Sequence, residues 1–410
     1  MNIKRIMTAS LDCITRFRSS RFPLKNIAQD IIRLRRLNSK ERKALLDLVF
    51  CWSRNINLFR EYTINSTEFS HSLSTQQIDS LALQMMGQEL GLNDELGSSQ
   101  VKEYHQWLSS LGDQQYLMAL GDFMGAKLKA DRGGRALEIA KGLFDQPDNY
   151  LAVDTRLMEA EWVFEALKKI DHHPFLHPML SSAIGIRGAF DLRSLPPKIQ
   201  DAVWVMDAGS QMIASLICPK PADKVLDLCV GEGNKARMVS QNDCKLLICD
   251  IDQKRLMRAK SRIPGAEFMH GDGQKLPLDK DTFDHVLLDV PCSGTGVLRR
   301  HPDLIHRLKK EDVDRCVKLQ RGLLNSAFRA LKPGGRLIYA TCSLLVEENE
   351  RQVELALKEN CQIKPLPFGE IGSQLKLSGI PLNDHWFTLY PHVHNCDGFF
   401  FASLTKSTKE

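Results

Sequence analysis

The second half of the chain alternates between short apolar runs and helical patterns, and this alternation limits the fold more than any other feature. Each run is bounded by turn residues and has the length of a strand buried on both faces. Strands that alternate with helices predict βαβ units and a parallel sheet, which binds ligands at the carboxyl ends of its strands. The expected strands are Lys224–Cys229, Lys245–Asp252, Glu267–Asp272, His285–Pro291 and Arg336–Cys342.

Two of these strands end in a cysteine that is followed by a serine. Cys292 follows Leu287–Pro291, and Cys342 follows Leu337–Thr341. If the two strands are neighbours, both thiols lie at the same edge of the sheet, around a shared crevice. A structural cysteine lies more often within a strand, packed as a small hydrophobe. Two cysteines at strand ends therefore indicate chemistry.

The 410 residues are too many for one ordinary domain, and their 43% hydrophobic and 26% charged content is typical of a soluble globular protein. We expect an all-helical domain over 1–148, a small α+β linker subdomain over 149–205 and the sheet domain over 206–410. No apolar stretch is long enough to cross a bilayer, so no membrane partner is expected. The eleven cysteines form no Cys-x-x-Cys pair, which favours free thiols in a reducing cytoplasm and no metal site.

Positive charge is concentrated at the amino end. Residues 1–60 contain 14 Lys and Arg against 4 Asp and Glu, whereas residues 61–150 contain 6 against 13. Such a basic cluster can form a phosphate-binding face or a solvated helix face, and its composition leaves both open. The cluster consists of Arg16, Arg18, Arg21, Lys25, Arg33, Arg35 and Arg36.

The first strand of the series leads into a glycine-containing turn that suits a cofactor. Such a turn lets backbone approach a ligand, and the helix that follows favours negative groups at its start. The turn lacks the Gly-x-Gly-x-x-Gly fingerprint, which disfavours a nicotinamide cofactor. Asp250, after the second strand, can accept both hydroxyls of a ribose, and Asp272, after the third, suits an exocyclic amine such as that of adenine. Together these features indicate a nucleoside-bearing cofactor.

These motifs resemble those of the RNA cytosine-5 methyltransferases, which carry a Pro-Cys-Ser and a Thr-Cys-Ser motif on adjacent strands of a sheet that binds S-adenosylmethionine. The resemblance covers residues from about 150 to 404, and the helical front end resembles a NusB-like RNA-binding domain more loosely. It implies a class I, Rossmann-like methyltransferase fold with a mostly parallel seven-stranded sheet. The matching segments are Asp289–Gly296, Arg299–Asp303, Leu331–Gly335, Tyr339–Ser343, Glu347–Asn349 and Asp397–Phe400.

The resemblance also implies roles for individual residues. Cys342 is expected to attack carbon 6 of cytosine, which makes carbon 5 nucleophilic, and Cys292 to help release the product. Asp289 is expected to hold the base edge, and Lys235 to stabilise it electrostatically. The expected contacts to S-adenosylmethionine are Cys229, Val230, Gly231, Glu232, Gly233, Asn234, Lys235, Asp250, Asp272 and Asp289.

The expected partner is RNA, most simply 16S ribosomal RNA, and the protein is expected to be a monomer. A flipped or single-stranded cytosine would enter the site, while Arg299, Arg300 and the basic front end bind RNA phosphates.

The cofactor turn departs from the family pattern, with Glu232 in place of a proline and Asn234 in place of a glycine. Glu232 places a negative charge close to where the methionine carboxylate would bind, whereas Asn234 tolerates a left-handed backbone. This departure keeps two alternatives open. One is a weak or inactive RNA-binding or ribosome-assembly factor on the same fold, and the other is a methyltransferase that acts on transfer RNA.

Overall fold

The computed structural model describes residues 1–66, 73–92, 98–170, 173–187, 190–371 and 377–408. They form two compact units: Met1–Phe144 with Leu298–Lys309, and Asp145–Val297 with Lys310–Glu410. The three-domain division at 148 and 205 stays a prediction. The sequence did not indicate that Leu298–Lys309, which follows the Pro-Cys-Ser motif, packs with the amino-terminal helices. None of the described helices is long and apolar enough to span a membrane.

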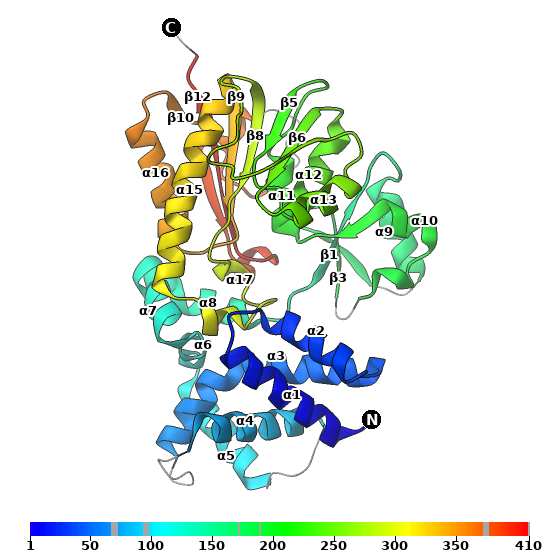
Figure 1. The fold of residues 1–410 in the computed structure, drawn as a ribbon, viewed down its shortest axis with the longest axis vertical. Helices are drawn as coiled ribbons and strands as arrows, with labels where there is room; N and C mark the ends of the chain where they lie inside the picture. Colours follow the sequence, from blue (N-terminus) through cyan, green and yellow to red (C-terminus); the bar gives the residue numbers. More distant parts are fainter. Residues whose placement is uncertain (67–72, 93–97, 171–172, 188–189, 372–376, 409–410) are drawn as a thin grey trace. The chain divides into compact units, whose positions relative to one another are not determined.

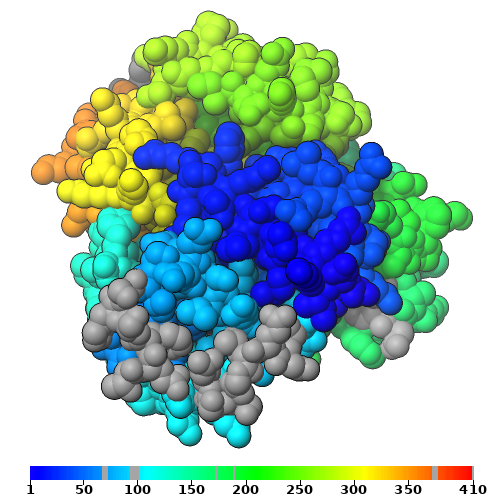
Figure 2. Space-filling model, turned by 60° about the horizontal axis from the view of Figure 1, so that its bottom comes forward, coloured from blue at the N-terminus to red at the C-terminus, as the bar shows by residue number. Residues whose placement is uncertain are grey.

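The first unit is helical, and its core is formed by the apolar faces of its longest helices. Helix α3 begins with a capping box in which Asn38 and Glu41 satisfy each other's backbone N–H groups. Residues 1–60, which carry the excess positive charge, form a continuous part of the surface of this unit (blue in Figure 2). The helices are α1 (Ile3–Arg18), α2 (Leu24–Leu34), α3 (Ser39–Asn65), α4 (Thr75–Glu89), α5 (Ser98–Leu111), α6 (Gln114–Ala119), α7 (Gly121–Arg132), α8 (Ala136–Phe144) and α14 (Leu304–Arg307).

Three polar contacts attach the segment Leu298–Lys309 to the other helices of this unit. The carboxylate of Asp303, only 1% exposed, accepts a hydrogen bond from the Leu24 backbone N–H at 3.2 Å. It thereby supplies the cap that α2 lacks on its own residues. His306 Nε2 donates to the carbonyl of Ser53 at 2.7 Å, and Arg54 donates to the carbonyl of Arg299 at 3.2 Å. The His306 ring also packs against Phe17 and Trp52.

The second unit begins with a small antiparallel sheet in the order β2-β3-β1-β4. Its apolar core includes Leu151, Ile184 and Val203 from the strands and Val163 and Leu167 from helix α9. The elements are β1 (Asn149–Val153), α9 (Ala160–Lys169), β2 (Pro174–His177), β3 (Leu180–Ile186), α10 (Pro197–Ala202) and β4 (Val203–Val205).

The main sheet has the strand order β10-β12-β9-β8-β5-β6-β7, with β11 paired to β12. Neighbours from β9 to β7 are parallel, and β10, β11 and β12 add an antiparallel edge. All five expected strands are present, although their ends differ by a few residues. The strands are β5 (Lys224–Asp227), β6 (Lys245–Asp250), β7 (Glu267–His270), β8 (Phe283–Asp289), β9 (Leu331–Thr341), β10 (Ile363–Pro365), β11 (Trp386–Leu389) and β12 (Phe399–Lys406).

Helices cover both faces of this sheet, as Figure 1 shows. Alternate strand residues supply the two cores: Val225 packs on the side of α11–α13, whereas Leu226 packs on the side of α15 and α16. This buries both faces and explains the continuous apolar runs. The helices are α11 (Ala208–Ser215), α12 (Asn234–Val239), α13 (Gln253–Arg262), α15 (Lys310–Ala330), α16 (Glu350–Glu359) and α17 (Pro391–His394).

The strand order reverses at β5. The chain runs from β5 outward through β6 and β7, then returns to place β8 and β9 on the other side of β5. In open α/β sheets, ligands bind outside the carboxyl ends of the strands at such a switch point. The loops after β5 and β8 lie there, and they contain the glycine turn and Cys292.

Candidate active site

The two cysteines of the strand-end motifs are in contact. Strands β8 and β9 pair with Asp289 opposite Ala340, so their loops leave the sheet side by side. The Sγ atoms of Cys292 and Cys342 lie 3.3 Å apart, a distance at which one thiol can donate a hydrogen bond to the other sulfur. Both sulfurs can therefore reach one small ring.

The two thiols have different electrostatic surroundings. The hydrogen bond to Cys342, burial and the nearby Glu348 carboxylate raise the pKa of Cys292 well above its ordinary value. Cys292 is therefore held as a neutral thiol. Cys342 instead interacts electrostatically with Lys235. Cys342, with this cation nearby, is the better placed nucleophile.

Lys235 and Asp289 form an ion pair beside the thiols. Lys235 Nζ donates to Asp289 Oδ2 at 2.7 Å, and the ammonium lies over the ring of Phe399, 5.7 Å from its centroid. Burial acts to lower the pKa of Lys235, but the charge and hydrogen bond of Asp289 outweigh this and raise it. Lys235 therefore stays charged, and the pair presents an acceptor and a cation at the same edge.

The loop that carries Cys292 is packed tightly against the backbone before β12. Gly296 N–H donates to the carbonyl of Cys342 at 2.8 Å, and the Gly296 carbonyl accepts from Gly398 N–H at 2.8 Å. A Cβ on Gly296 would lie 2.0 Å from the Gly398 carbonyl oxygen. Gly296 and Gly398, which belong to two separate motifs, are therefore in backbone contact, and a side chain at either position would clash with the other residue.

Two glycines of the cofactor turn have left-handed backbones. Gly231 has φ +56° and Gly233 has φ +82°, and a Cβ on Gly233 would lie 2.8 Å from Cβ of Ala259. Space around Gly231 is open, since no heavy atom lies within 4 Å of an added Cβ. Gly233 takes the left-handed conformation, whereas Asn234 is the first residue of α12, so its tolerance of a left-handed backbone is not used.

The acids at the strand ends hold the turn and retain capacity for a ligand. Asp250 accepts from Gly231 N–H at 2.9 Å through Oδ2 and from Asp252 N–H at 2.7 Å through Oδ1. Each carboxylate oxygen can accept two hydrogen bonds, so Asp250 can also bind ribose hydroxyls. Asp272 accepts from the backbone of Gln274 at 3.0 Å. The open turn and these carboxylates fit the nucleoside half of S-adenosylmethionine.

Glu232 does not direct an uncompensated charge at this turn. Its carboxylate accepts two hydrogen bonds from Arg258, at 2.7 and 3.1 Å, and lies 3.5 Å from a guanidinium nitrogen of Arg262. The hydrogen bond from Arg258 lowers the pKa of Glu232 despite partial burial. The expected repulsion of the methionine carboxylate is therefore offset by two cations of α13.

Two groups at the end of β5 also shape the site. Burial, followed by the charge of Asp289, raises the pKa of Asp227 to about 8, so this carboxyl at the end of β5 is mostly protonated at neutral pH. Burial and the carboxylates around it, first Asp227, raise the pKa of Cys229 well above its usual value. Cys229 is thus a half-buried, neutral thiol within the turn. Within the described ranges, no group of three or more His, Cys, Asp or Glu side chains could hold a metal ion.

The basic cluster at the amino end is partly neutralised inside its own unit. Arg18 forms a bidentate ion pair with Asp79 and lies over the ring of Trp52, and Arg35 pairs with Asp12. Arg299 is only 3% exposed, so the expected phosphate contact from its side chain was wrong. A contact surface for RNA must therefore use other cations.

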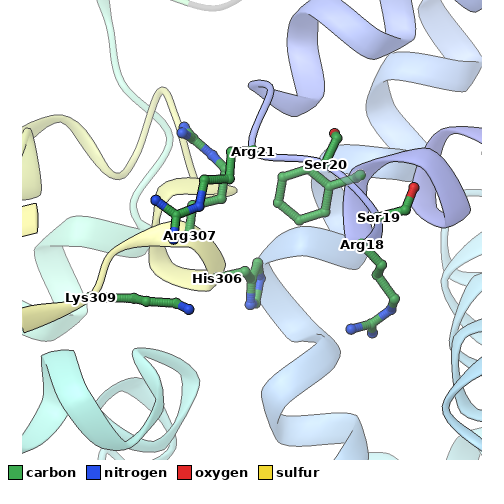
Figure 3. Close-up of a pocket in the computed structure, with 8 residues that line it drawn as sticks. Arg18, Ser19, Ser20, Arg21, His306, Arg307 and Lys309 are labelled. Carbon is green, nitrogen blue, oxygen red and sulfur yellow. The ribbon is translucent and has the colours of Figure 1, made fainter. Parts of the chain in front are cut away.

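A basic cavity of about 410 Å³ supplies such cations in the same unit. Its lining comes from two segments far apart in the sequence, the end of α1 and the end of α14 (Figure 3). Arg21 and Lys309 are exposed. Arg307 forms an ion pair with Asp303 at 3.1 Å. His306 also faces this cavity, and burial lowers its pKa to about 4, so it is neutral there. The lining residues are Phe17, Arg18, Ser19, Ser20, Arg21, His306, Arg307 and Lys309.

The reversed strand order, the glycine turn and the acids at successive strand ends define a class I methyltransferase. The family model for 16S rRNA methyltransferase RsmB/F matches residues 214–405. A relative from Erwinia tasmaniensis, named ribosomal RNA small subunit methyltransferase B, is 30% identical over 303 residues, which cover 72% of this chain and 68% of the relative. The chain therefore belongs to the RsmB/F family.

The first three curated relatives, all with this name, align over 66, 68 and 62% of their own lengths, so the match spans about two thirds of each. Among solved structures, a methyltransferase homologue from Pyrococcus horikoshii is 26% identical, with a TM-score of 0.60 over 72% of this chain and 98% of that one. The crystal structure of PH0851 shares the fold over 99% of both chains, with a TM-score of 0.76 at 20% identity.

Proposed function

We propose that this protein is an S-adenosylmethionine-dependent methyltransferase that forms 5-methylcytosine in 16S ribosomal RNA. The contact between the Cys292 and Cys342 sulfurs, beside the Lys235–Asp289 ion pair, carries this proposal. Two adjacent thiols are what a covalent addition and elimination on one pyrimidine requires. Family membership supports both the cofactor and the RNA class. The protein is proposed to act as a monomer in the cytoplasm.

Bound S-adenosylmethionine supplies an electrophilic methyl group, and every other step uses residues of this chain. The Cys342 thiolate adds to carbon 6 of a flipped cytosine, and the electron pair of the 5,6 double bond moves to carbon 5, which takes the methyl group. The proton on carbon 5 then passes to solvent water, and the neutral Cys292 thiol beside the ring supports its removal. The double bond re-forms as the carbon 6–sulfur bond breaks, which releases Cys342.

The ion pair and the turn have complementary roles in this proposal. Asp289 accepts from the exocyclic amine of cytosine, and the charge of Lys235 stabilises the electron density that reaches nitrogen 3. Asp250 and Asp272 would bind the ribose and the adenine amine of S-adenosylmethionine, and the turn from Cys229 to Asn234 would contact the same cofactor.

The basic cavity in the amino-terminal unit supports RNA binding from a second surface. Its exposed cations, Arg21 and Lys309, line one cavity and have the positive charge that holds backbone phosphate. Phosphate contacts give affinity and orientation but no sequence information, so the cavity is proposed to position the RNA.

The two alternatives have less support. An inactive assembly factor was suggested by the charge of Glu232, yet Arg258 and Arg262 offset that charge. Transfer RNA as the substrate is not favoured by the names of the curated relatives.

Bisulfite sequencing of 16S rRNA after incubation with the purified protein and S-adenosylmethionine tests this function. We expect one cytosine to become protected only when both are present. Protection of a transfer RNA cytosine instead, or of none, would contradict the proposal.

A further inference from the structure

Glu348 is a fully buried carboxylate next to the two cysteine loops, with 0% of its surface exposed. Its Oε1 accepts from the Ser293 backbone N–H at 2.8 Å and from Gln320 Nε2 at 3.0 Å. Its Oε2 accepts from the hydroxyls of Ser293 and Ser343, the latter at 2.5 Å. These four donors match the four lone-pair positions of a carboxylate group.

The two serines are the residues that directly follow the active-site cysteines. Their hydroxyl oxygens lie 3.1 Å apart, and both donate to the same carboxylate oxygen. Gln320 of α15 extends the connection, because its Nε2 also donates to the carbonyl of Pro291 at 3.0 Å. One carboxylate therefore ties the residue before Cys292, the residue after it and the residue after Cys342 into one network.

The backbone around Glu348 is fixed independently. Its own carbonyl accepts from the hydroxyl of Tyr339 at 2.6 Å, and the neighbouring Asn349 binds both the Thr341 hydroxyl, at 2.6 Å, and the Ser343 carbonyl, at 2.8 Å. The carboxylate is thus anchored to β9 and its loop while it reaches the loop after β8.

We propose that Glu348 is a positioning residue that couples the two cysteine loops, so that both sulfurs address the same pyrimidine ring. It does not touch substrate, and it acts through Ser293 and Ser343. The inference rests on the proposed function, in which both thiols act on one base.

The carboxylate has a second effect through its charge. Its negative charge acts on Cys292, where it disfavours a thiolate. Cys292 then stays protonated and does not compete with Cys342 as a nucleophile. Loss of this charge lowers the pKa of Cys292.

The test compares Glu348→Gln with Glu354→Gln, which changes an exposed glutamate of the adjacent helix α16. Glutamine keeps the size of the side chain, but its NH₂ group is a donor. It would face the donors that now bind the carboxylate, so the hydrogen bonds on that side would be lost. Because a misplacement of about 1 Å can cost about 100-fold in rate, we expect kcat on 16S rRNA to fall by about that factor. The calorimetric Kd for S-adenosylmethionine should stay within about twofold. The control variant should match the parent protein in both.

A second readout does not depend on methylation. Iodoacetamide reacts with the thiolate, so the pH profile of Cys292 alkylation, followed by peptide mass spectrometry, reports its pKa. In Glu348→Gln this profile should move to lower pH by at least about one unit, which is about tenfold faster alkylation at a fixed lower pH.

An unchanged kcat, an unchanged alkylation profile, or an equal loss of cofactor binding and rate would each overturn the inference. If Glu348→Gln does not fold, Ser343→Ala carries the test: a kcat lower by about tenfold with unchanged cofactor binding supports the inference, and a parental kcat overturns it. A parent protein that does not methylate 16S rRNA would refute the proposed function alone, since the alkylation profile still tests Glu348.

Discussion

Substitution of Gly296 by alanine should separate the two catalytic loops without touching a reacting group. The added Cβ would lie 2.0 Å from the carbonyl oxygen of Gly398, 2.6 Å from its carbonyl carbon and 2.9 Å from the carbonyl oxygen of Cys342. Carbon and carbonyl oxygen atoms in contact are normally about 3.3–3.6 Å apart. All three clashing atoms are backbone, so no side chain can rotate away, and the loops must part by more than about 1 Å.

This displacement acts directly on the positions of the sulfurs. Gly296 N–H donates to the carbonyl of Cys342, and parting the loops breaks this bond. A misplacement of about 1 Å can cost about 100-fold in rate. Overpacking of this kind costs about 1–3 kcal/mol in the free energy of unfolding.

The assay is single-turnover transfer of a labelled methyl group to 16S rRNA, with cofactor affinity measured by calorimetry and unfolding by urea titration. Gly134→Ala is the matched control, since no heavy atom lies within 4 Å of its added Cβ. We expect about 100-fold slower transfer for Gly296→Ala only, with cofactor affinity retained because the glycine turn lies after another strand. A parental transfer rate in folded Gly296→Ala would refute the argument that this contact positions the thiols.

Two further predictions concern the amino-terminal unit. Burial lowers the pKa of folded His306 to about 4, below its unfolded value of 6.5, so the stability that the neutral ring contributes is complete above pH 6.5 and is lost as the pH falls toward 4. Urea titrations should therefore show the free energy of unfolding decreasing by up to about 3 kcal/mol over this range. An equally steep decrease in the His306→Gln variant would contradict this prediction. Charge reversal of Arg21 and Lys309 should weaken RNA binding and reduce the slope of log affinity against log salt by about one to two. The control is Lys129→Glu, which reverses an exposed charge outside the cavity. An unchanged slope would show that the cavity does not bind phosphate.

The alternation of apolar runs and helical patterns was sufficient to predict the main sheet. It also predicted that Cys292 and Cys342 lie at the same edge of that sheet. The five expected strands are present, and β8 and β9 are neighbours because buried apolar runs that alternate with helices have few ways to pair. The identified family and fold class were confirmed. The roles assigned to single residues stay predictions.

Features that depend on pairs of distant residues could not be predicted from local pattern. Arg258 lies on α13, and nothing in the sequence between it and Glu232 indicates that their side chains meet. Asp303 caps α2 from a segment almost 280 positions away. Glu348 stands in a recognisable motif, but only the fold brings Ser293 and Ser343 to the same carboxylate. Each case involves a polar partner chosen by tertiary packing.

The central claim is that two sulfurs in contact divide addition and elimination between them, with Cys342 as the nucleophile. Peptide mass spectrometry of Cys292→Ala, incubated with 16S rRNA and S-adenosylmethionine, tests it most directly. We expect a covalent RNA adduct to accumulate on Cys342, because elimination is blocked, and neither adduct nor product with Cys342→Ala. An adduct that accumulates on Cys292 in Cys342→Ala, or full turnover without Cys342, would contradict the account.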